Sequence, residues 1–371
     1  MNTKILVLGT RGFPNTQGGV EKHCEELYPR LAKLGCEITV LARSPYFLKQ
    51  NRAAEWEGVK FKYIWCPRKK SIEALVHTFF GVIYARLKSP DILHVHAVGP
   101  SLLVPLAKML GLKVIMTHHG PDYEREKWGK AAKMVLRLGE YFGVKFADRI
   151  IAISNLIKTG LEKKFERKDV VLIANGVNIP DFAFGGETLK KYGLFSGRYI
   201  FTACRFVPEK GLHDLINAYK SLTNPKFKLV IAGGADHETE YSRNLIKKAE
   251  AAEVTLTGFI SGRPLAELYS NAGLFVLPSY YEGLPIALLE AMSYNLPVLV
   301  SDIEANKEVP IPSFRFFKAS DANELAAKIE ELFKAGISEE EKLNQKLTLV
   351  RDYDWDVISK QTKTVYENMR R

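Results

Sequence analysis

The chain has 371 residues and a net charge of +11, and 46% of its residues are hydrophobic. This length exceeds what one compact core accommodates, so two domains are expected, and the composition excludes a disordered or low-complexity protein. The longest apolar stretch, 102–116, is interrupted by Pro105, Lys108 and Lys113. It therefore falls short of the roughly 18 uninterrupted apolar residues of a membrane-spanning helix.

Cysteine usage and the start of the chain indicate the compartment. The four cysteines are scattered and show no CxxC or other metal-binding spacing, which is typical of buried, reduced thiols. Reduced thiols are typical of the cytoplasm. Only four consecutive apolar residues, 5–8, precede Gly9, and these are too few for the apolar core of a signal peptide. We therefore expect a cytoplasmic protein.

The positive charge is concentrated in the first half of the chain. Residues 1–180 contain 29 Lys and Arg against 16 Asp and Glu, a net +13, whereas residues 181–371 contain 24 against 26, a net −2. This asymmetry predicts an anionic partner for the first half, either a membrane surface or a phosphorylated ligand. We find no recognition-helix, RRM-like or zinc-finger signature, so nucleic acid is not the expected partner.

Residues 1–180 alternate short apolar runs with helical patterns. Continuous apolar strands interleaved with helices are typical of a parallel sheet that is covered on both faces. The helical patterns include 20–34, 72–87 and 127–146. The expected strands are 5–8, 38–41, 61–64, 92–95, 114–117, 150–153 and 170–173.

The same alternation restarts after a junction from Asn175-Gly176-Val177 through Pro180. Two doubly wound α/β domains are the simplest account, and such domains bind ligands at the carboxyl ends of their strands. We expect the site in a cleft where the two domains face each other. The expected helices are 210–222, 240–253, 264–271 and 285–293, and the expected strands are 199–203, 228–232, 254–256, 274–277 and 298–301.

The segment YYEGLPIALLE, residues 280–290, places two glutamates eight positions apart around a helix start. Glu282 follows an apolar strand, and Gly283 permits a close approach of a ligand to the backbone. Pro285 suits the first turn of a helix, whose N-terminus is a ready site for a phosphate. Glu290 lies about one and a half turns further on. The two carboxylates are therefore expected to contact different parts of one extended ligand.

The segment CRFVPEKG, residues 204–211, ends the first strand of the second half and supplies the opposite charge. It brings Arg205 and Lys210 to the same end of the sheet as the helix start at Pro285. Arginine provides a planar fork and lysine a point charge, so the two predict a clamp for a diphosphate. Arg205 alone would more often be a surface or packing residue, but the conjunction with Lys210 and the two glutamates favours a binding site.

These segments, together with TRGFPNTQGGVEKH, THHGPD, IANGV and IAGG, resemble the retaining glycosyltransferases of family 4, which have the GT-B fold. Glu282 and Glu290 match the E-x7-E motif of that family. An E-x7-E pair alone is weak, but the segments occur in order along nearly the whole chain. The resemblance implies two Rossmann-like domains facing each other across a cleft. Residues 1–178 would form the acceptor side and 179–353 the nucleotide-sugar side, with a C-terminal helix, 354–371, packing back on the first domain.

The resemblance also implies a role for each matching residue. Glu290 would hydrogen-bond the nucleotide ribose, and Glu282 would bind hydroxyls of the donor sugar. Arg205 and Lys210 would neutralise the charge on the leaving diphosphate, and His119 would lie near the transferred sugar. The implied catalytic set is Glu282, His119, Arg205 and Lys210. The implied donor-binding set is Gly18, Gly19, Arg205, Lys210, Glu282, Gly283, Leu284 and Glu290.

The chain departs from the family at one position of this site and lacks a metal motif. The family usually has glycine where this chain has Cys204, so the backbone before Arg205 is expected to differ slightly. No Asp-x-Asp pair stands at the end of an expected strand. Arg205, Lys210 and the dipole of the helix that starts at Pro285 would supply positive charge instead. We therefore expect a nucleoside-diphosphate sugar as donor substrate, with no cofactor and no metal.

Two basic segments of the first half accompany apolar faces. Arg68, Lys69 and Lys70 precede the helical pattern 72–87, and Lys127, Lys130, Lys133 and Arg137 lie within about 120° on a helical wheel. Basic stripes beside apolar faces are typical of peripheral proteins on anionic bilayers. The alternative is a core-packing helix with a solvated basic side. The first interpretation predicts a peripheral location at the inner face of the cell membrane.

The expected function is transfer of a sugar to a glycan or lipid-linked acceptor, in polysaccharide or glycan biosynthesis. A nucleotide-sugar epimerase with two similar domains would isomerise the sugar without an acceptor, and the combination of Arg205, Lys210 and E-x7-E argues against it. A catalytically silent peripheral membrane scaffold would retain only the fold. Donor hydrolysis by the pure protein separates an enzyme from such a scaffold.

Overall fold

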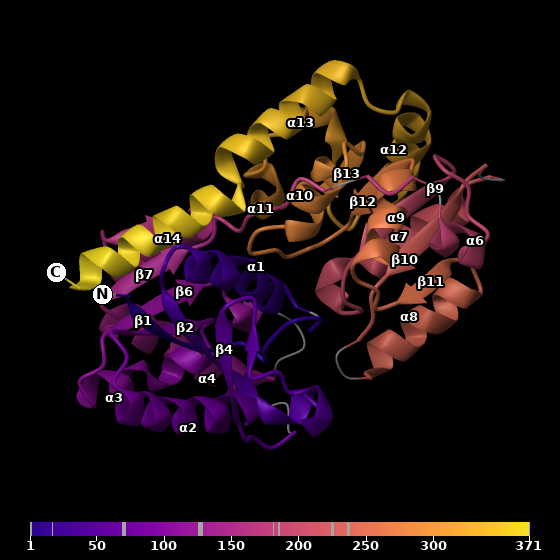
Figure 1. The fold of residues 1–371 in the computed structure, drawn as a ribbon. Coiled ribbons are helices and arrows are strands. Elements are labelled where there is room, and N and C mark those ends of the chain that lie inside the picture. The colour runs from indigo at the N-terminus through magenta and orange to yellow at the C-terminus, as the bar shows by residue number, and fades with distance from the viewer. Residues whose placement is uncertain are drawn as a thin grey trace. The chain divides into compact units, whose positions relative to one another are not determined.

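The computed structural model describes residues 2–16, 18–68, 72–124, 129–180, 182–184, 186–223, 226–235 and 238–370. The chain divides into two compact units (Figure 1). The first unit is Met1–Asn175 together with Trp355–Arg371, and the second is Gly176–Asp354. The first division lies three residues before the boundary expected at 178/179. The second division lies one residue after the boundary expected at 353/354.

The first unit is built on an eight-stranded sheet in the described part of the chain, with the order β3-β4-β2-β1-β5-β6-β7-β8. Its neighbouring strands pair in parallel, except that β3 is antiparallel to β4. The apolar runs are buried on both faces, as a parallel sheet between helices requires. The strands are β1 (Lys4–Leu8), β2 (Glu37–Arg43), β3 (Glu55–Trp56), β4 (Val59–Ile64), β5 (Ile92–His96), β6 (Val114–His118), β7 (Arg149–Ala152) and β8 (Val170–Leu172).

Helices cover both faces of this sheet. Helices α1 and α14 lie over one face, and α2, α3 and α4 lie over the other (Figure 1). The helices of the first unit are α1 (Gly19–Lys33), α2 (Glu73–Lys88), α3 (Val104–Met109), α4 (Lys130–Phe146), α5 (Asn155–Phe165) and α14 (Trp355–Arg370). Short 3-10 turns are η1 (Ser44–Tyr46), η2 (Lys49–Asn51), η3 (Pro100–Leu103) and η4 (Asp122–Glu124).

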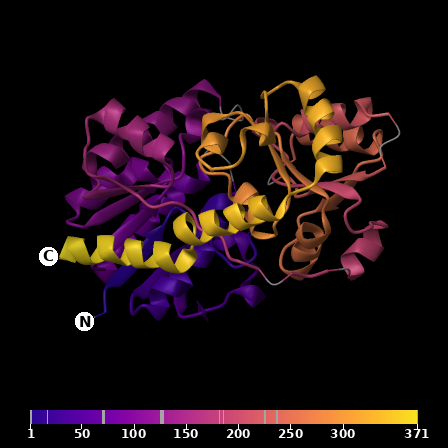
Figure 2. The same ribbon diagram turned by 90° about the horizontal axis from the view of Figure 1, so that it is seen from above.

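The C-terminal helix α14 completes the core of the first unit. Its apolar side chains, including Trp355 and Tyr366, belong to the same buried cluster as Leu27 of α1 and Ile5 of β1. The Arg30 guanidinium of α1 lies 3.2 Å from the Asp356 carboxylate. Helix α14 runs along the first unit in Figure 1 and also in Figure 2, as expected for a helix that returns to the first domain.

The second unit repeats the doubly wound architecture on a six-stranded sheet, counted over the described residues, with the order β11-β10-β9-β12-β13-β14. All neighbouring strands of this sheet pair in parallel. The strands are β9 (Tyr199–Ala203), β10 (Lys228–Ala232), β11 (Thr255–Gly258), β12 (Leu274–Leu277), β13 (Val298–Ser301) and β14 (Phe316–Phe317).

Side chains cap the first turns of three helices among the described residues of the second unit, α8, α12 and α13. The Thr239 hydroxyl accepts from the Ser242 N–H at the start of α8, and the Asp321 carboxylate accepts from the Glu324 N–H at the start of α12. The helices are α6 (Glu187–Tyr192), α7 (Leu212–Ser221), α8 (Glu240–Glu250), α9 (Arg263–Asn271), α10 (Ile286–Ser293), α11 (Glu304–Lys307), α12 (Ala322–Ala335) and α13 (Glu339–Asp352), and the 3-10 turns are η5 (Pro208–Lys210) and η6 (Ser313–Arg315).

Some expected boundaries differ from the observed ones. The helix expected at 210–222 is divided into η5 and α7, because Gly211 adopts a left-handed conformation with φ of 62°. The helix expected from residue 127 is observed from Lys130, and Lys127 lies outside the described residues. In the part of the chain that the structure describes, no helix combines the length and apolar character needed to cross a bilayer.

Candidate active site

The strand order of the second unit reverses between β9 and β12. From β9 the chain moves outward through β10 and β11, and from β12 it moves outward in the opposite direction through β13 and β14. Such a reversal leaves a crevice at the carboxyl ends of the two central strands, where open α/β sheets bind ligands. The loop that carries Arg205 and Lys210 follows β9, and the loop that carries Glu282 follows β12. The structure therefore brings these predicted residues to the switch point of their sheet.

Lys210 and Glu282 form an ion pair across this switch point. The Lys210 Nζ lies 2.5 Å from Glu282 Oε1, and the Ser279 hydroxyl donates to the same oxygen at 2.6 Å. The side chains of Lys210 and Glu282 are only 17% and 10% exposed. A pair with this little exposure is screened less by solvent and salt than a surface pair.

The backbone around Lys210 fixes the two loops against each other. The Tyr280 N–H donates to the Glu209 carbonyl at 2.9 Å. A Cβ atom on Gly211 would lie 2.0 Å from the Pro278 carbonyl oxygen, so this close approach requires glycine. Arg205 is half-buried in the same loop, and the N–H of the next residue, Phe206, donates to the Gly234 carbonyl at 2.9 Å.

The other predicted donor-binding residues of the second unit lie around helix α10. Glu290 is half-buried in α10, and the Tyr269 hydroxyl donates to its Oε2 at 3.0 Å. The Tyr269 ring stacks on the Tyr294 ring with centroids 5.2 Å apart. Gly283 and Leu284 precede the helix, and Leu284 is buried. Tyr269, which was not predicted, thus holds the second glutamate of the E-x7-E pair.

The glycine-rich loop of the first unit is held by a buried ion pair. Gly18, with φ of 149°, precedes Gly19, the first residue of α1. The Arg11 Nε lies 3.1 Å from Glu21 Oε1. Burial alone would raise the pKa of Glu21, but the adjacent Arg11 guanidinium and its hydrogen bonds hold that pKa below its ordinary value. A Cβ on Gly18 would lie 2.1 Å from Glu21 Oε2, so the pair and the glycine depend on each other.

His118 and His119 have different surroundings. His118 is buried, and its Nε2 lies 3.1 Å from Glu140 Oε1 while its Nδ1 accepts from the Gly120 N–H at 3.1 Å. Lys164 and Tyr123 also bind Glu140, so His118 belongs to a structural polar network. His119 is half-buried at the carboxyl end of β6. Of the two, His119 is the histidine that solvent reaches.

A network of buried imidazoles and tyrosines, not predicted from the sequence, is linked to His119. The His119 Nε2 is 2.9 Å from His96 Nδ1, and His96 Nε2 is hydrogen-bonded to the Tyr28 hydroxyl. The His94 Nδ1 is 2.7 Å from the Tyr366 hydroxyl. The only sequence signal is LHVH, residues 93–96, which puts two histidines on one face of a strand end.

Burial keeps these imidazoles neutral. Burial lowers the pKa of His23 to about 4, and burial together with nearby His23 lowers the pKa of His94 to about 3. Burial and the neighbouring histidines lower the pKa of His96 well below its ordinary value. All three rings are therefore uncharged at neutral pH.

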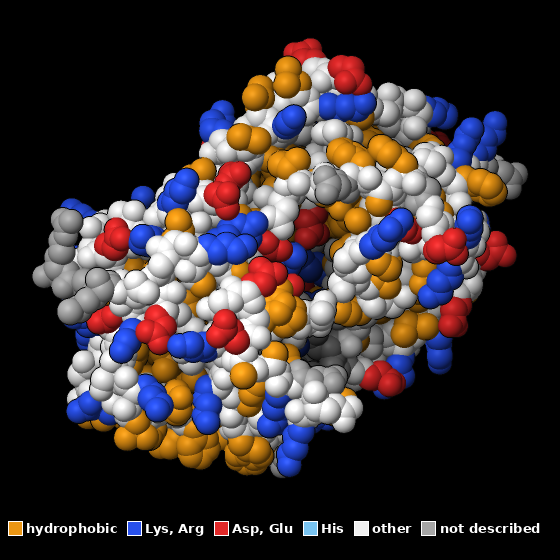
Figure 3. Space-filling model, viewed as in Figure 1, with side chains coloured by type: hydrophobic (Ala, Val, Ile, Leu, Met, Phe, Trp, Pro, Cys, Tyr) orange, Lys and Arg blue, Asp and Glu red, His pale blue; other side chains and the backbone are white. Residues whose placement is uncertain are grey.

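The predicted membrane-facing residues are described only in part. Lys69, Lys70 and Lys127 lie outside the described residues, whereas Arg68 donates to the Pro45 carbonyl. On α4, Lys130 and Arg137 are exposed and Lys133 is half-buried. Large apolar side chains are exposed beside them and form an apolar band on the lower edge of the molecule in Figure 3. The exposed apolar residues of α2 and α4 are Leu75, Phe79, Phe80, Ile83, Leu87, Met134, Val135, Leu138, Tyr141 and Phe146.

Comparison with solved structures defines the class of fold. The sucrose-phosphate synthase of Thermosynechococcus elongatus superposes with a TM-score of 0.83 at 20% identity, covering 99% of both chains. The Anabaena protein Alr3699/HepE in complex with UDP-glucose gives a TM-score of 0.79 at 16% identity, covering 99% of this chain and 100% of that chain. The chain therefore has the GT-B fold, with a doubly wound sheet in each unit.

Sequence comparison identifies the family. The family model described as Glycosyltransferase Family 4 matches residues 17–180, and the model described as Glycosyl transferases group 1 matches residues 187–348. The chain belongs to the family 4 glycosyltransferases. This assignment favours sugar transfer over the epimerase and the silent scaffold that the sequence analysis left open.

Two curated relatives illustrate the range of the family. An uncharacterized glycosyltransferase of Methanocaldococcus jannaschii is 26% identical over 370 residues, covering 95% of each chain. The UDP-Gal:alpha-D-GlcNAc-diphosphoundecaprenol alpha-1,3-galactosyltransferase of Escherichia coli is 30% identical over 245 residues, covering 60% of this chain and 61% of that one.

Proposed function

We propose that this enzyme is a retaining, metal-independent glycosyltransferase. It moves a sugar from a nucleoside-diphosphate sugar to a glycan or lipid-linked acceptor. The observation that carries the proposal is the Lys210–Glu282 pair, held beside Arg205 at the switch point of the second unit. An ammonium group has three N–H donors, so Lys210 can hold Glu282 and a phosphate oxygen at the same time.

The proposed chemistry follows from the charges at this switch point. Departure of the nucleoside diphosphate concentrates negative charge on the phosphate that leaves the sugar. Lys210 and Arg205 would lie where that charge develops, and preorganised donors of this kind lower the transition-state energy. Glu282, held by Ser279 and Lys210, would accept from hydroxyls of the donor sugar. Glu290, held by Tyr269, would accept from the two ribose hydroxyls.

The same groups support the proposed metal independence. Two cationic side chains and the N-terminus of α10 can together compensate a diphosphate that a divalent cation would otherwise neutralise. Retention of the anomeric configuration is proposed from the resemblance to retaining family 4 enzymes. The complex of Alr3699/HepE with UDP-glucose makes UDP-sugars the first donors to test, and the diphosphoundecaprenol substrate of the E. coli relative makes a lipid-linked diphosphate the first acceptor.

The experiment is slow donor hydrolysis by the pure protein, measured over a panel of UDP-, GDP- and ADP-sugars. We expect nucleotide release from one class of donor, unchanged by EDTA, and a released sugar that first appears with the anomeric configuration of the donor in NMR. Lys210→Met should remove the hydrolysis, whereas Lys247→Met on the exposed face of α8 should keep it. An isomerised nucleotide sugar without nucleotide release would contradict transfer, and loss with EDTA that Mg²⁺ restores would contradict metal independence.

The surface of α2 and α4 supports a peripheral membrane location. On α2, residues Phe79, Phe80 and Leu87 are 45%, 46% and 77% exposed. Aromatic and large aliphatic residues are usually buried. Lys130, Lys133 and Arg137 lie on α4, which covers the same face of the sheet as α2 (Figure 1). An apolar band with a basic border matches a bilayer that carries anionic lipid, which is where a lipid-linked diphosphate acceptor would be presented. The protein would bind the inner face of the cell membrane reversibly.

A further inference from the structure

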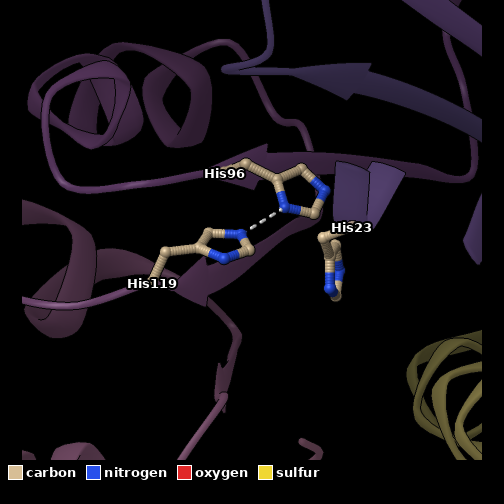
Figure 4. A group of neighbouring side chains, drawn as sticks. All are labelled: His23, His96 and His119. Atoms are coloured by element: carbon tan, nitrogen blue, oxygen red, sulfur yellow. Dashed lines mark hydrogen bonds between the residues drawn. The ribbon is translucent and has the colours of Figure 1, made fainter. Parts of the chain in front are cut away.

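Three imidazoles converge at the carboxyl end of the sheet in the first unit (Figure 4). His96 ends β5, His119 directly follows β6, and His23 lies in the second turn of α1. One ring nitrogen of each histidine lies within 4.8 Å of the corresponding nitrogens of the other two. His23 and His96 are buried, and His119 is half-buried, so the cluster is open to solvent on the side of His119.

His23 presents an unused lone pair to this cluster. Its Nδ1 is 2.7 Å from the Asn175 amide oxygen, which can only accept, so Nδ1 carries the ring hydrogen. The opposite nitrogen, Nε2, then has a lone pair. Among the described residues, no hydrogen-bond donor reaches this buried Nε2. A buried acceptor without a partner is uncommon and calls for an explanation.

His96 is held in a comparable way. Its Nε2 is bonded to the Tyr28 hydroxyl, and this hydroxyl is also 3.1 Å from His94 Nδ1. Its Nδ1 is directed at His119 Nε2, 2.9 Å away, and one proton must lie between these two nitrogens (Figure 4). Histidines that bind metals usually have their outer nitrogen fixed by an oxygen partner of this kind. Asn175 and Tyr28 supply such partners.

We propose that His23 Nε2, His96 Nδ1 and His119 Nε2 form a binding site for a divalent transition metal of the zinc class. Three imidazole nitrogens suit zinc, and they are poor ligands for magnesium or calcium, which prefer oxygen. The bound ion would replace the proton shared by His96 and His119 and would satisfy the lone pair of His23. Three protein ligands leave a fourth position, on the side of His119, for water or another ligand.

Occupation of this site would oppose sugar transfer. His119 cannot bind a metal through Nε2 and offer the same nitrogen to the transferred sugar. Zinc should therefore inhibit an enzyme whose transfer needs no metal, and EDTA should relieve the inhibition. This coupling rests on the proposed role of His119 in transfer, whereas the binding of the metal does not depend on that role.

The test is zinc binding to the EDTA-treated and dialysed full-length protein, measured by competition with a chromophoric chelator. The wild type should bind one zinc ion, and Co²⁺ should give the visible absorption bands of a low-coordinate site. His119→Gln should weaken binding by roughly 100-fold or more, because it removes a ligand. Asn175→Ala should weaken binding by about 10–100-fold, because it removes the partner that orients His23. His213→Gln, in the second unit, should bind zinc as tightly as the wild type.

Failure of the site and failure of the proposed function give different results. The proposed zinc site would be wrong if the wild type bound no stoichiometric zinc. It would also be wrong if His119→Gln bound zinc as tightly as the wild type. Zinc that binds through these histidines yet leaves donor hydrolysis unaffected would retain the site and refute the role of His119 in transfer. His119 is half-buried and is the ligand whose replacement least disturbs packing, and thermal unfolding of His119→Gln near the wild-type temperature confirms that the variant is folded.

Discussion

The Lys210 ammonium and the Glu282 carboxylate form a short ion pair although 72 residues separate them in the chain. They meet because the loops after β9 and β12 leave the sheet at its point of reversal. The group proposed to neutralise the diphosphate is thus bonded to the group proposed to bind the sugar. A change in either residue should therefore affect the interactions with both the diphosphate and the sugar of the donor.

Replacement of Lys210 should slow the chemical step more than it weakens donor binding. The leaving-group charge is greatest in the transition state, so Lys210→Met should lower kcat by roughly 10²–10³. Arg205→Ala should also act mainly on kcat. The control is Lys247→Met, and the measurement is steady-state kinetics with the donor found in the panel. A rise of KM alone in Arg205→Ala or Lys210→Met would show that the residue binds donor without stabilising the transition state.

Lys210→Met and Glu282→Gln should not be additive. Because the two side chains are in direct contact, the first change leaves Glu282 without its cation, and the second then costs less than it does alone. The double variant should lose less activity than the product of the two single losses. Full additivity in kcat would indicate that the pair does not act as a unit in the donor complex.

Gly211 should be intolerant of a side chain for two separable reasons. Gly211 and Gly197 both have positive φ, 62° and 69°, and a left-handed conformation costs about 1–2 kcal/mol for other residues. Only Gly211 would place a Cβ against backbone, 2.0 Å from the Pro278 oxygen, whereas a Cβ on Gly197 meets nothing within 4 Å. Gly211→Ala should therefore lower the free energy of unfolding by at least about 1 kcal/mol more than Gly197→Ala does. Urea unfolding followed by circular dichroism measures the difference, and equal losses would exclude the clash.

The first unit should lose stability as the pH falls below 6.5. The folded-state pKa of His23 is about 4 and that of His94 about 3, both below the ordinary 6.5. Unfolding therefore takes up protons below pH 6.5, and the stability present above this pH declines towards pH 4. Each histidine contributes at most about 1.4 kcal/mol per pH unit. All four tryptophans lie in the first unit, so their fluorescence reports its unfolding in urea at pH 7.5, 6 and 5. A midpoint that does not move across this range would contradict neutral, buried histidines.

Vesicle binding should depend on both the charge and the apolar side chains of α2 and α4. The triple change of Lys130, Lys133 and Arg137 to Glu should abolish co-sedimentation with anionic vesicles, since each basic group near such a surface contributes about 1 kcal/mol. Phe79→Ser with Phe80→Ser should weaken binding at low and high salt alike. Donor hydrolysis should persist in both variants, because none of the replaced residues belongs to the proposed catalytic or donor-binding sets. Equal recovery of the wild type with anionic and neutral vesicles, at low and high salt, would favour a solvated basic surface and a soluble acceptor.

The sequence predicted most strands, because continuous apolar runs such as 199–203 and 274–277 are long enough to be recognised. It did not predict β3 or β14, which are two residues long and have no periodicity of their own. The start of α7 was wrong by two residues, because a left-handed Gly211 ends one turn and begins another. Strand and helix patterns are local, whereas a conformational break at one glycine depends on the neighbouring Pro278 loop.

The candidate site was predictable where one motif contains its residues. Glu282 and Glu290 belong to a single segment, and Lys210 is identified by its own motif. The partners that hold them, Ser279 and Tyr269, carry no such signal. The histidine cluster draws on α1, β5 and the loop after β6, so its members become neighbours only when the sheet forms. Contacts between distant segments depend on topology, which spacing along the chain does not reveal.

The return of α14 to the first unit has a consequence for synthesis of the protein. Trp355, Ile358 and Tyr366 belong to the buried core of a unit whose other residues end at Asn175. On the ribosome, Gly176–Asp354 must be translated before that core can close, which takes on the order of 10–35 s at typical elongation rates. During this interval the nascent first unit exposes an apolar strip over α1 and its sheet. The residues of the second unit are contiguous in the chain. This unit can therefore fold before α14, the last helix of the first unit, leaves the ribosomal exit tunnel.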